Sequence, residues 1–197
     1  MGNPTKTAGI LALQGDFELH VKMLDRIGAP WRLVKHVRDL DDVDSLIMPG
    51  GESTTMLKFF ANESMGAAIR EFAAKGKPIF GTCAGAILMA REVLGPAQES
   101  LRLLDITVER NAYGRQIDSA VRSGDCPALA SHPIEMVFIR APIIRRTGEG
   151  IRVLGKADGL PVLVEQKNLL AATFHPELTE DPTIHRYFLG KMDSSVR

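Results

Sequence analysis

One stretch of the sequence passes from an apolar strand through a cysteine directly into a helix, which strongly limits how the chain can fold. Residues 78–80 predict a buried strand, and residues 84–91 predict a helix. A glycine stands two positions before and two positions after Cys83, as expected where the backbone turns so sharply that a neighbouring Cβ would collide. The G-x-C-x-G pattern of residues 81–85 therefore predicts a nucleophile elbow.

The predicted elbow would place Cys83 above the strand ends, at the start of a helix. A helix N-terminus carries partial positive charge and unpaired backbone N–H groups, which stabilise an anionic sulfur or a developing oxyanion. The helix dipole contributes only about 0.3–1 kcal/mol, so we expect a general base elsewhere in the chain.

Three more apolar runs predict buried parallel strands, at residues 8–13, 31–35 and 45–48. The first run ends at residues 14–15, and the third opens into a glycine-rich turn at residues 49–55. Apolar residues recur at helical spacing between the runs, so strands and helices alternate. This order predicts a three-layer α/β fold with a central, mostly parallel sheet.

The second half of the chain has a different pattern. Short β-like runs follow one another, at residues 101–110, 135–140, 151–157, 161–165 and 169–174. Asp158-Gly159 is a typical hairpin turn between two of them. We therefore expect an antiparallel extension of the sheet, within a single domain over residues 1–197 whose N-terminus, residues 1–7, is flexible.

The charge balance limits the kinds of partner. Lysine and arginine number 24, and aspartate and glutamate also number 24, so the formal net charge is zero and neither nucleic acid nor an anionic membrane is expected. Two cysteines are too few for a disulfide framework, and the sequence shows neither an apolar signal region nor a membrane-length apolar run. We expect a cytoplasmic protein that binds a small molecule or another protein.

A candidate base follows the last predicted strand, in the segment His175-Pro176-Glu177. In an extended segment, residues i and i+2 point the same way, so Glu177 could orient the imidazole of His175. The cysteine, histidine and glutamate would then act as nucleophile, base and orienting group of a triad. The alternative is that Cys83 is a small core residue and His175 an ordinary loop histidine.

The turn at residues 49–53 is expected at the same edge of the sheet as the elbow. The backbone N–H groups of Gly51 and Ala84 would then form an oxyanion hole, in which losing one donor typically costs about 3–4 kcal/mol. The alternative is a simple tight turn without function.

The other histidines and the second cysteine give weaker signals. Four histidines lie in predicted helices or connections and are expected to be structural or solvated: His20, His36, His132 and His185. Cys126 has neither an elbow nor a nearby base, so we expect it to be inert. No cysteine and histidine pairs have metal-ligand spacing, so we expect no metal site.

Four motifs carry a family resemblance: Pro-Gly-Gly-Glu-Ser-Thr-Thr at 49–55, Gly-Thr-Cys-Ala-Gly at 81–85, Val-Glu-Arg-Asn-Ala-Tyr-Gly-Arg-Gln at 108–116, and Phe-His-Pro-Glu-Leu at 174–178. Together they resemble the class I (triad) glutamine amidotransferases, specifically the glutaminase subunits of pyridoxal 5′-phosphate synthase. The resemblance covers about residues 9–189. Departures include residues 119–133 and Ala86, where a larger aliphatic residue is common, and none touches the triad.

The resemblance implies a flavodoxin-like fold, no cofactor and a thioester mechanism. Cys83 would attack the side-chain amide of glutamine. His175 would protonate the departing ammonia and later activate water, while Glu177 orients His175. The glutamine contacts of the family map onto Gly51, Glu52, Ser53, Arg110, Ile139 and Arg140.

The resemblance also implies a partner. This would be the synthase subunit, which is a (β/α)8 barrel that receives the ammonia in a large ring-shaped hetero-oligomer and activates the glutaminase on docking. Gln14 and Gly15 are expected at the docking edge. Two alternatives stay open: a γ-glutamyl hydrolase of related fold that needs no partner, and a binding module that has kept the fold without activity.

Overall fold

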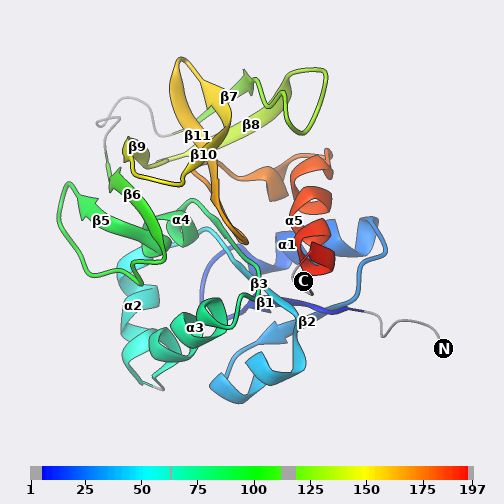
Figure 1. Ribbon diagram of the computed structural model, residues 1–197, viewed down its shortest axis with the longest axis vertical. Coiled ribbons are helices and arrows are strands. Elements are labelled where there is room, and N and C mark those ends of the chain that lie inside the picture. Colours follow the sequence, from blue (N-terminus) through cyan, green and yellow to red (C-terminus); the bar gives the residue numbers. More distant parts are fainter. Residues whose placement is uncertain (1–5, 63, 112–118, 195–197) are drawn as a thin grey trace.

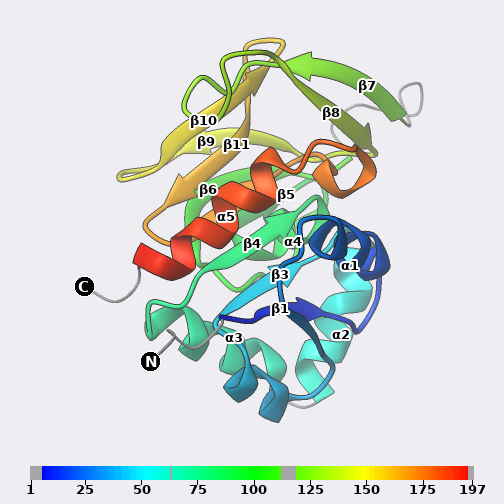
Figure 2. The ribbon, with the colours of Figure 1, turned by 90° about the vertical axis from the view of Figure 1, so that its right-hand side faces the viewer.

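The computed structural model describes residues 6–62, 64–111 and 119–194, and its centre is a seven-stranded sheet (Figures 1 and 2). The strand order is β10-β11-β12-β4-β3-β1-β2. Its strands are β1 (Ala8–Leu11), β2 (Trp31–Val34), β3 (Ser45–Met48), β4 (Ile79–Thr82), β10 (Arg152–Ala157), β11 (Leu160–Gln166) and β12 (Leu169–Ala172). The first four strands and β12 are parallel, whereas β10 and β11 form the antiparallel extension.

Helices cover both faces of this sheet (Figure 1). On one face lie α1 (Phe17–Arg26) and α5 (Thr183–Ser194), where Leu24 and Phe188 belong to one buried apolar cluster with Phe80 of β4. The other face carries α2 (Ser53–Asn62), α3 (Met65–Ala74), α4 (Ala84–Met89) and the short 3-10 helix η1 (Val37–Asp42). Every residue of β1, β3 and β4 is buried, as expected for parallel strands between two helical layers. The predicted α/β fold with a mostly parallel sheet is confirmed.

There are two smaller sheets among the described residues, and the one formed by β7 (Ser119–Gly124) and β8 (Ile134–Ile139) lies at the upper end of the molecule in Figure 2. This sheet is a hairpin. The other contains β5 (Ala90–Leu94), β6 (Leu104–Glu109) and β9 (Ile143–Thr147). The first two residues of β5, Ala90 and Arg91, were expected to end a helix. The strand pairs with β6 in parallel rather than antiparallel orientation. The helix stops at Met89 because the backbone becomes extended at Ala90.

The predicted hairpin turn between β10 and β11 is present. Asp158 and Gly159 both have positive φ angles, of 50° and 77°. These left-handed conformations suit aspartate and glycine, and they match the twist of an antiparallel pair.

Candidate active site

Cys83 lies at a sharp turn between β4 and α4. Its φ of 45° and ψ of −101° are unusual for a residue with a side chain. A Cβ at Gly81 would lie 2.6 Å from the carbonyl carbon of Gly85, and one at Gly85 would overlap the carbonyl oxygen of Met48. Both glycines are thus sterically required, as predicted for an elbow.

The thiol of Cys83 lies against two groups that come from distant parts of the chain. It borders the same cavity as the ring of His175, which follows β12, and the thiol raises the pKa of that ring. Its Sγ lies 3.9 Å from the carbonyl oxygen of Ile139 at the end of β8. The side chain borders a cavity of about 310 Å³. The structure therefore brings the predicted nucleophile and the predicted base together.

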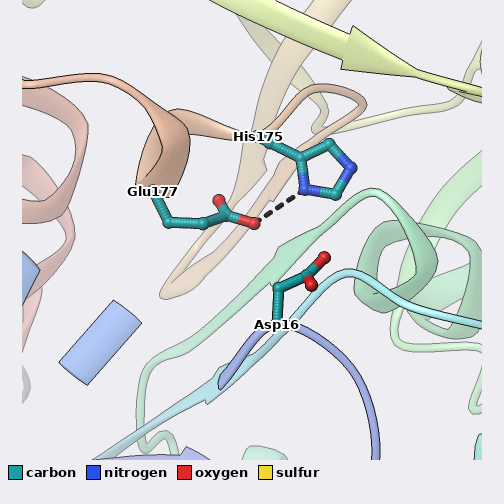
Figure 3. A group of neighbouring side chains, drawn as sticks. All are labelled: Asp16, His175 and Glu177. Atoms are coloured by element: carbon teal, nitrogen blue, oxygen red, sulfur yellow. Dashed lines mark hydrogen bonds and ion pairs between the residues drawn. The ribbon is translucent and has the colours of Figure 1, made fainter. Parts of the chain in front are cut away.

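Glu177 completes the series. Its Oε1 lies 2.8 Å from Nδ1 of His175, and its side chain is fully buried (Figure 3). The expected extended geometry is wrong, because Pro176–Leu178 forms a 3-10 helix, η2. Pro176 occupies the first turn of this helix, where its fixed φ angle favours a bend. The bend still places the carboxylate beside the imidazole.

Burial and polar contacts shift the pKa values of His175 and Glu177 in opposite directions. Burial by itself would lower the pKa of His175, but its hydrogen bonds to Cys83 and Glu177 and the charges of those partners outweigh burial and raise the pKa to about 10. Burial would raise the pKa of Glu177, yet His20 and His175 lower it overall. The series therefore favours a protonated imidazole next to an ionised carboxylate.

The glycine-rich turn after β3 lies against the same imidazole. A Cβ on Gly50 would lie 2.9 Å from Nδ1 of His175, and Gly51 has a φ of 144° that only glycine adopts easily. Glu52 donates its backbone N–H to Oε1 of Gln14, at 3.0 Å. Gly51 borders the cavity, while Ala84 is the first residue of α4.

All the residues predicted to contact glutamine border this cavity: Gly51, Glu52, Ser53, Arg110, Ile139 and Arg140. Nη2 of Arg110 lies 3.5 Å from Oε1 of Glu52, and Arg140 has a φ of 42°. The cavity thus carries both positive and negative charge, which suits an amino acid. The last part of the predicted motif, residues 112–116, lies outside the described residues, as do residues 1–5 of the predicted flexible N-terminus.

Sequence reasoning missed Asp16, Ile87 and Asn111, which also border the cavity. Asp16 has one signal in the sequence, because it directly follows the turn at residues 14–15 after β1. Its carboxylate points toward the triad (Figure 3), and one ligand atom each from Asp16, His175 and Glu177 lie within 4.8 Å of one another. Within this group, Nδ1 of His175 and Oε1 of Glu177 are hydrogen-bonded to each other at 2.8 Å.

The four remaining histidines divide into two pairs. His36 and His132 are exposed, but His20 and His185 are fully buried and lie 3.0 Å apart. The expectation that each of these histidines is structural or solvated therefore resolves as solvated for the first pair and structural for the second. Cys126 is also buried. Burial, and to a lesser extent the charge of Asp125, raise the pKa of its thiol to about 11, which agrees with the inert role expected for it.

A cysteine at the elbow after β4, a histidine after β12 and a mixed central sheet between two helical layers together define a class I glutamine amidotransferase. The SNO glutamine amidotransferase family matches residues 10–194. The chain belongs to this family.

Named relatives agree with this assignment. The chain is 52% identical over 192 residues to the pyridoxal 5′-phosphate synthase subunit PdxT of Solibacter usitatus, covering 95% of this chain and 100% of the relative. It is 51% identical to the subunit of the same name from Thermus thermophilus, covering 92% and 95%. A solved structure described as a glutamine amidotransferase has a TM-score of 0.89 and 46% identity, covering 94% and 98%. A glutamine amidotransferase from Thermotoga maritima shares the fold alone, with a TM-score of 0.62 at 12% identity, covering 98% and 84%.

Proposed function

We propose that this protein hydrolyses glutamine to glutamate and ammonia and supplies the ammonia for the synthesis of pyridoxal 5′-phosphate. One observation carries the proposal: Cys83 and His175 border one cavity with mixed charge, and Glu177 is hydrogen-bonded to His175 behind it. The relatives named as PdxT subunits support the choice of pathway. The chain acts as a single glutaminase domain.

The first half of the reaction forms a thioester. The sulfur of Cys83 attacks the amide carbon of glutamine, and the carbonyl oxygen becomes an oxyanion that the backbone N–H groups of Gly51 and Ala84 stabilise. When the intermediate collapses, the C–N bond breaks and the protonated His175 gives its Nε2 proton to the leaving nitrogen. Ammonia departs, and His175 is left neutral.

The second half hydrolyses the thioester. Neutral His175 removes a proton from water, and the oxygen of that water attacks the acyl carbon. The C–S bond then breaks, releasing glutamate and returning the sulfur of Cys83 to its starting state. Glu177 remains ionised throughout and stabilises each imidazolium that forms.

The charges of the cavity suit the remainder of the substrate. Arg110 and Arg140 are the candidates for binding the α-carboxylate, since a guanidinium pairs well with a carboxylate. Glu52 and Ser53, where the glycine-rich turn passes into α2, also border the cavity and would contact the amino end or the side-chain amide.

The proposed partner is the synthase subunit of pyridoxal 5′-phosphate synthase, which as a (β/α)8 barrel would receive the ammonia in a ring-shaped hetero-oligomer. Gln14 and Gly15 border the cavity and lie at the proposed docking edge. Oε1 of Gln14 accepts a hydrogen bond from the backbone N–H of Glu52. A displacement of Gln14 on docking would therefore move the turn at residues 49–53, which carries the N–H of Gly51. Among the described residues no helix is long and apolar enough to cross a membrane. We further propose a cytoplasmic location, where Cys83 stays reduced.

Ammonia release with and without the synthase subunit tests the proposal. We expect release of equal amounts of glutamate and ammonia that rises when the synthase subunit is added and disappears in Cys83→Ala. Strong cleavage of γ-glutamyl peptides without any partner would instead identify a γ-glutamyl hydrolase. An unchanged rate in Cys83→Ala would eliminate the thioester mechanism.

A further inference from the structure

Two buried histidines connect to the triad but have no role in the chemistry described above. Nδ1 of His20, in α1, lies 3.0 Å from Nε2 of His185, in α5. These two helices lie side by side in Figure 1. Nε2 of His20 faces β4, at 3.3 Å from Oγ1 of Thr82 and 3.6 Å from Oε1 of Glu177. Thr82 itself donates to the same carboxylate oxygen at 3.4 Å. A continuous polar chain therefore runs from α5 to Glu177.

This series of polar side chains lies inside an apolar layer. Both imidazoles are fully buried and meet the ring of Phe80 edge-on, at centroid distances of 6.4 and 5.8 Å. Burying a polar group without a hydrogen bond costs about 1–3 kcal/mol, so apolar side chains would fill this space at lower cost. The polar groups must therefore be explained by what they contact.

The proton positions along the chain follow from which groups can donate and which can accept. An ionised Glu177 can only accept, so the hydroxyl of Thr82 donates to it and must accept from the N–H at Nε2 of His20. Nδ1 of His20 is then an acceptor, and Nε2 of His185 donates to it. This leaves Nδ1 of His185 as a bare lone pair, and that atom has no partner among the described residues.

The reverse order of protons is less favourable. If Nδ1 of His20 donated to His185, the unpartnered Nδ1 of His185 would carry a buried N–H, and an unsatisfied buried donor costs about 1–3 kcal/mol. Thr82 would also have to donate to His20, and Glu177 would lose a donor.

The electrostatics agree with neutral rings. Burial lowers the pKa of His20, against the attraction of Glu177 and Asp16, and His175 lowers it further. Burial and the neighbouring His20 lower the pKa of His185 to about 3, opposed by Glu177. In their neutral forms each ring has one donor and one acceptor, as the proton order along the chain requires.

Glu177 depends on these contacts because its carboxylate is held at one oxygen. Oε1 accepts from His175 and Thr82 and lies near His20, whereas Oε2 is buried and finds no hydrogen-bond partner within the described part of the chain. Without the hydroxyl of Thr82, which the N–H of His20 orients, Oε1 would keep the hydrogen bond to His175 but lose its second donor. Rotation would then separate it from Nδ1.

We propose that His20 and Thr82 are positioning residues for the triad, aiming Oε1 of Glu177 at Nδ1 of His175, and that His185 fixes the tautomer of His20. This inference rests on the proposed function, because it assigns a role within the same reaction. Thr82 directly precedes Cys83, His20 lies in α1 and His185 lies in α5. The hydrogen-bonded side chains therefore link the elbow to both helices of one face.

A matched pair of variants at position 20 tests the proposal. The amide nitrogen of glutamine takes nearly the place of the donor Nε2, whereas the amide oxygen of asparagine takes nearly the place of the acceptor Nδ1. His20→Gln therefore keeps the donor toward Thr82 and Glu177, and His20→Asn keeps only the contact with His185. We expect His20→Asn and His20→Leu to lower kcat about tenfold to hundredfold, with little change in KM. A loss of this size is typical when a group that orients a metal-binding side chain is removed, and His20 orients a catalytic side chain in the same indirect way. We expect His20→Gln to retain most of the wild-type kcat.

Glutamine turnover with the synthase subunit is measured for each variant, together with the melting temperature and the rate at which iodoacetamide alkylates Cys83. The proposal predicts slower alkylation in His20→Asn than in His20→Gln at equal melting temperature. If kcat instead follows the melting temperature in all three variants, or if His20→Asn keeps its kcat, the positioning role is refuted.

Wild-type protein and Cys83→Ala, measured in the same assay, separate this inference from the proposed function. If ammonia release depends on Cys83 but not on the residue at position 20, the positioning role fails and the glutaminase function stands. If the wild type releases no ammonia, the function fails, and the alkylation rates still report whether the residue at position 20 affects the thiol.

Discussion

Replacing Gly50 by alanine should disable the site by displacing His175. The φ of Gly50 lies outside the left-handed region, so the backbone accepts alanine without strain. The added Cβ would lie 2.9 Å from Nδ1 of His175 and closer still to Cε1. The ring must therefore retreat by roughly 1 Å to reach ordinary van der Waals contact. A misplacement of about 1 Å can cost about a hundredfold in rate, and we expect a loss of that size in kcat.

Steady-state ammonia release with the synthase subunit present measures this effect. Gly190→Ala is the matched control, because a Cβ on this α5 residue meets nothing within 4 Å. We expect the control to keep the wild-type kcat. If Gly50→Ala turns over glutamine at the wild-type rate, the imidazole is not confined by this turn, and the steric reasoning is wrong.

Further predictions concern other residues of the site. Cys83→Ala should abolish glutamine hydrolysis while binding the synthase subunit normally, which co-purification measures. Cys126→Ala should keep kcat, and mass spectrometry of native protein treated briefly with iodoacetamide should find label at Cys83 and not at Cys126. Because its partners raise the pKa of His175 from 6.5 to about 10, protonation of His175 stabilises the fold fully below pH 6.5, and this stabilisation is lost as pH rises through 10. In Glu177→Gln the loss should begin at lower pH in denaturant unfolding, and an identical pH profile would contradict the assigned contact. Arg110→Ala should raise KM for glutamine at least tenfold if Arg110 binds the carboxylate, and an unchanged KM would refute that contact.

The parts of the fold that could be predicted share a local signal. Strands β1, β3 and β4 are uninterrupted apolar runs because both of their faces are buried. The elbow was predictable because steric exclusion at Gly81 and Gly85 leaves glycine as the residue that fits. These constraints act over a few residues, so they are visible in the sequence.

The missed elements lack such a signal. Strand β7 alternates between exposed and half-buried residues over most of its length, and Val121 within it is 65% exposed, so no apolar pattern marks the strand. The contact between His20 and His185 joins residues 165 positions apart, and each looks like an ordinary helical residue in isolation. The bend at Pro176 was missed because the same residues fit an extended segment.

The hairpin of β7 and β8 has a consequence for engineering. One end of β8 reaches the chemistry, since the carbonyl of Ile139 lies near Sγ of Cys83 and the backbone N–H of His175 donates to Val137 at 2.8 Å. The opposite end of the hairpin carries exposed residues at 131–133. A fluorophore inserted at residues 131–133 would therefore be attached to the hairpin that borders the cavity, without entering the cavity itself. It would report any displacement of the hairpin when the partner docks.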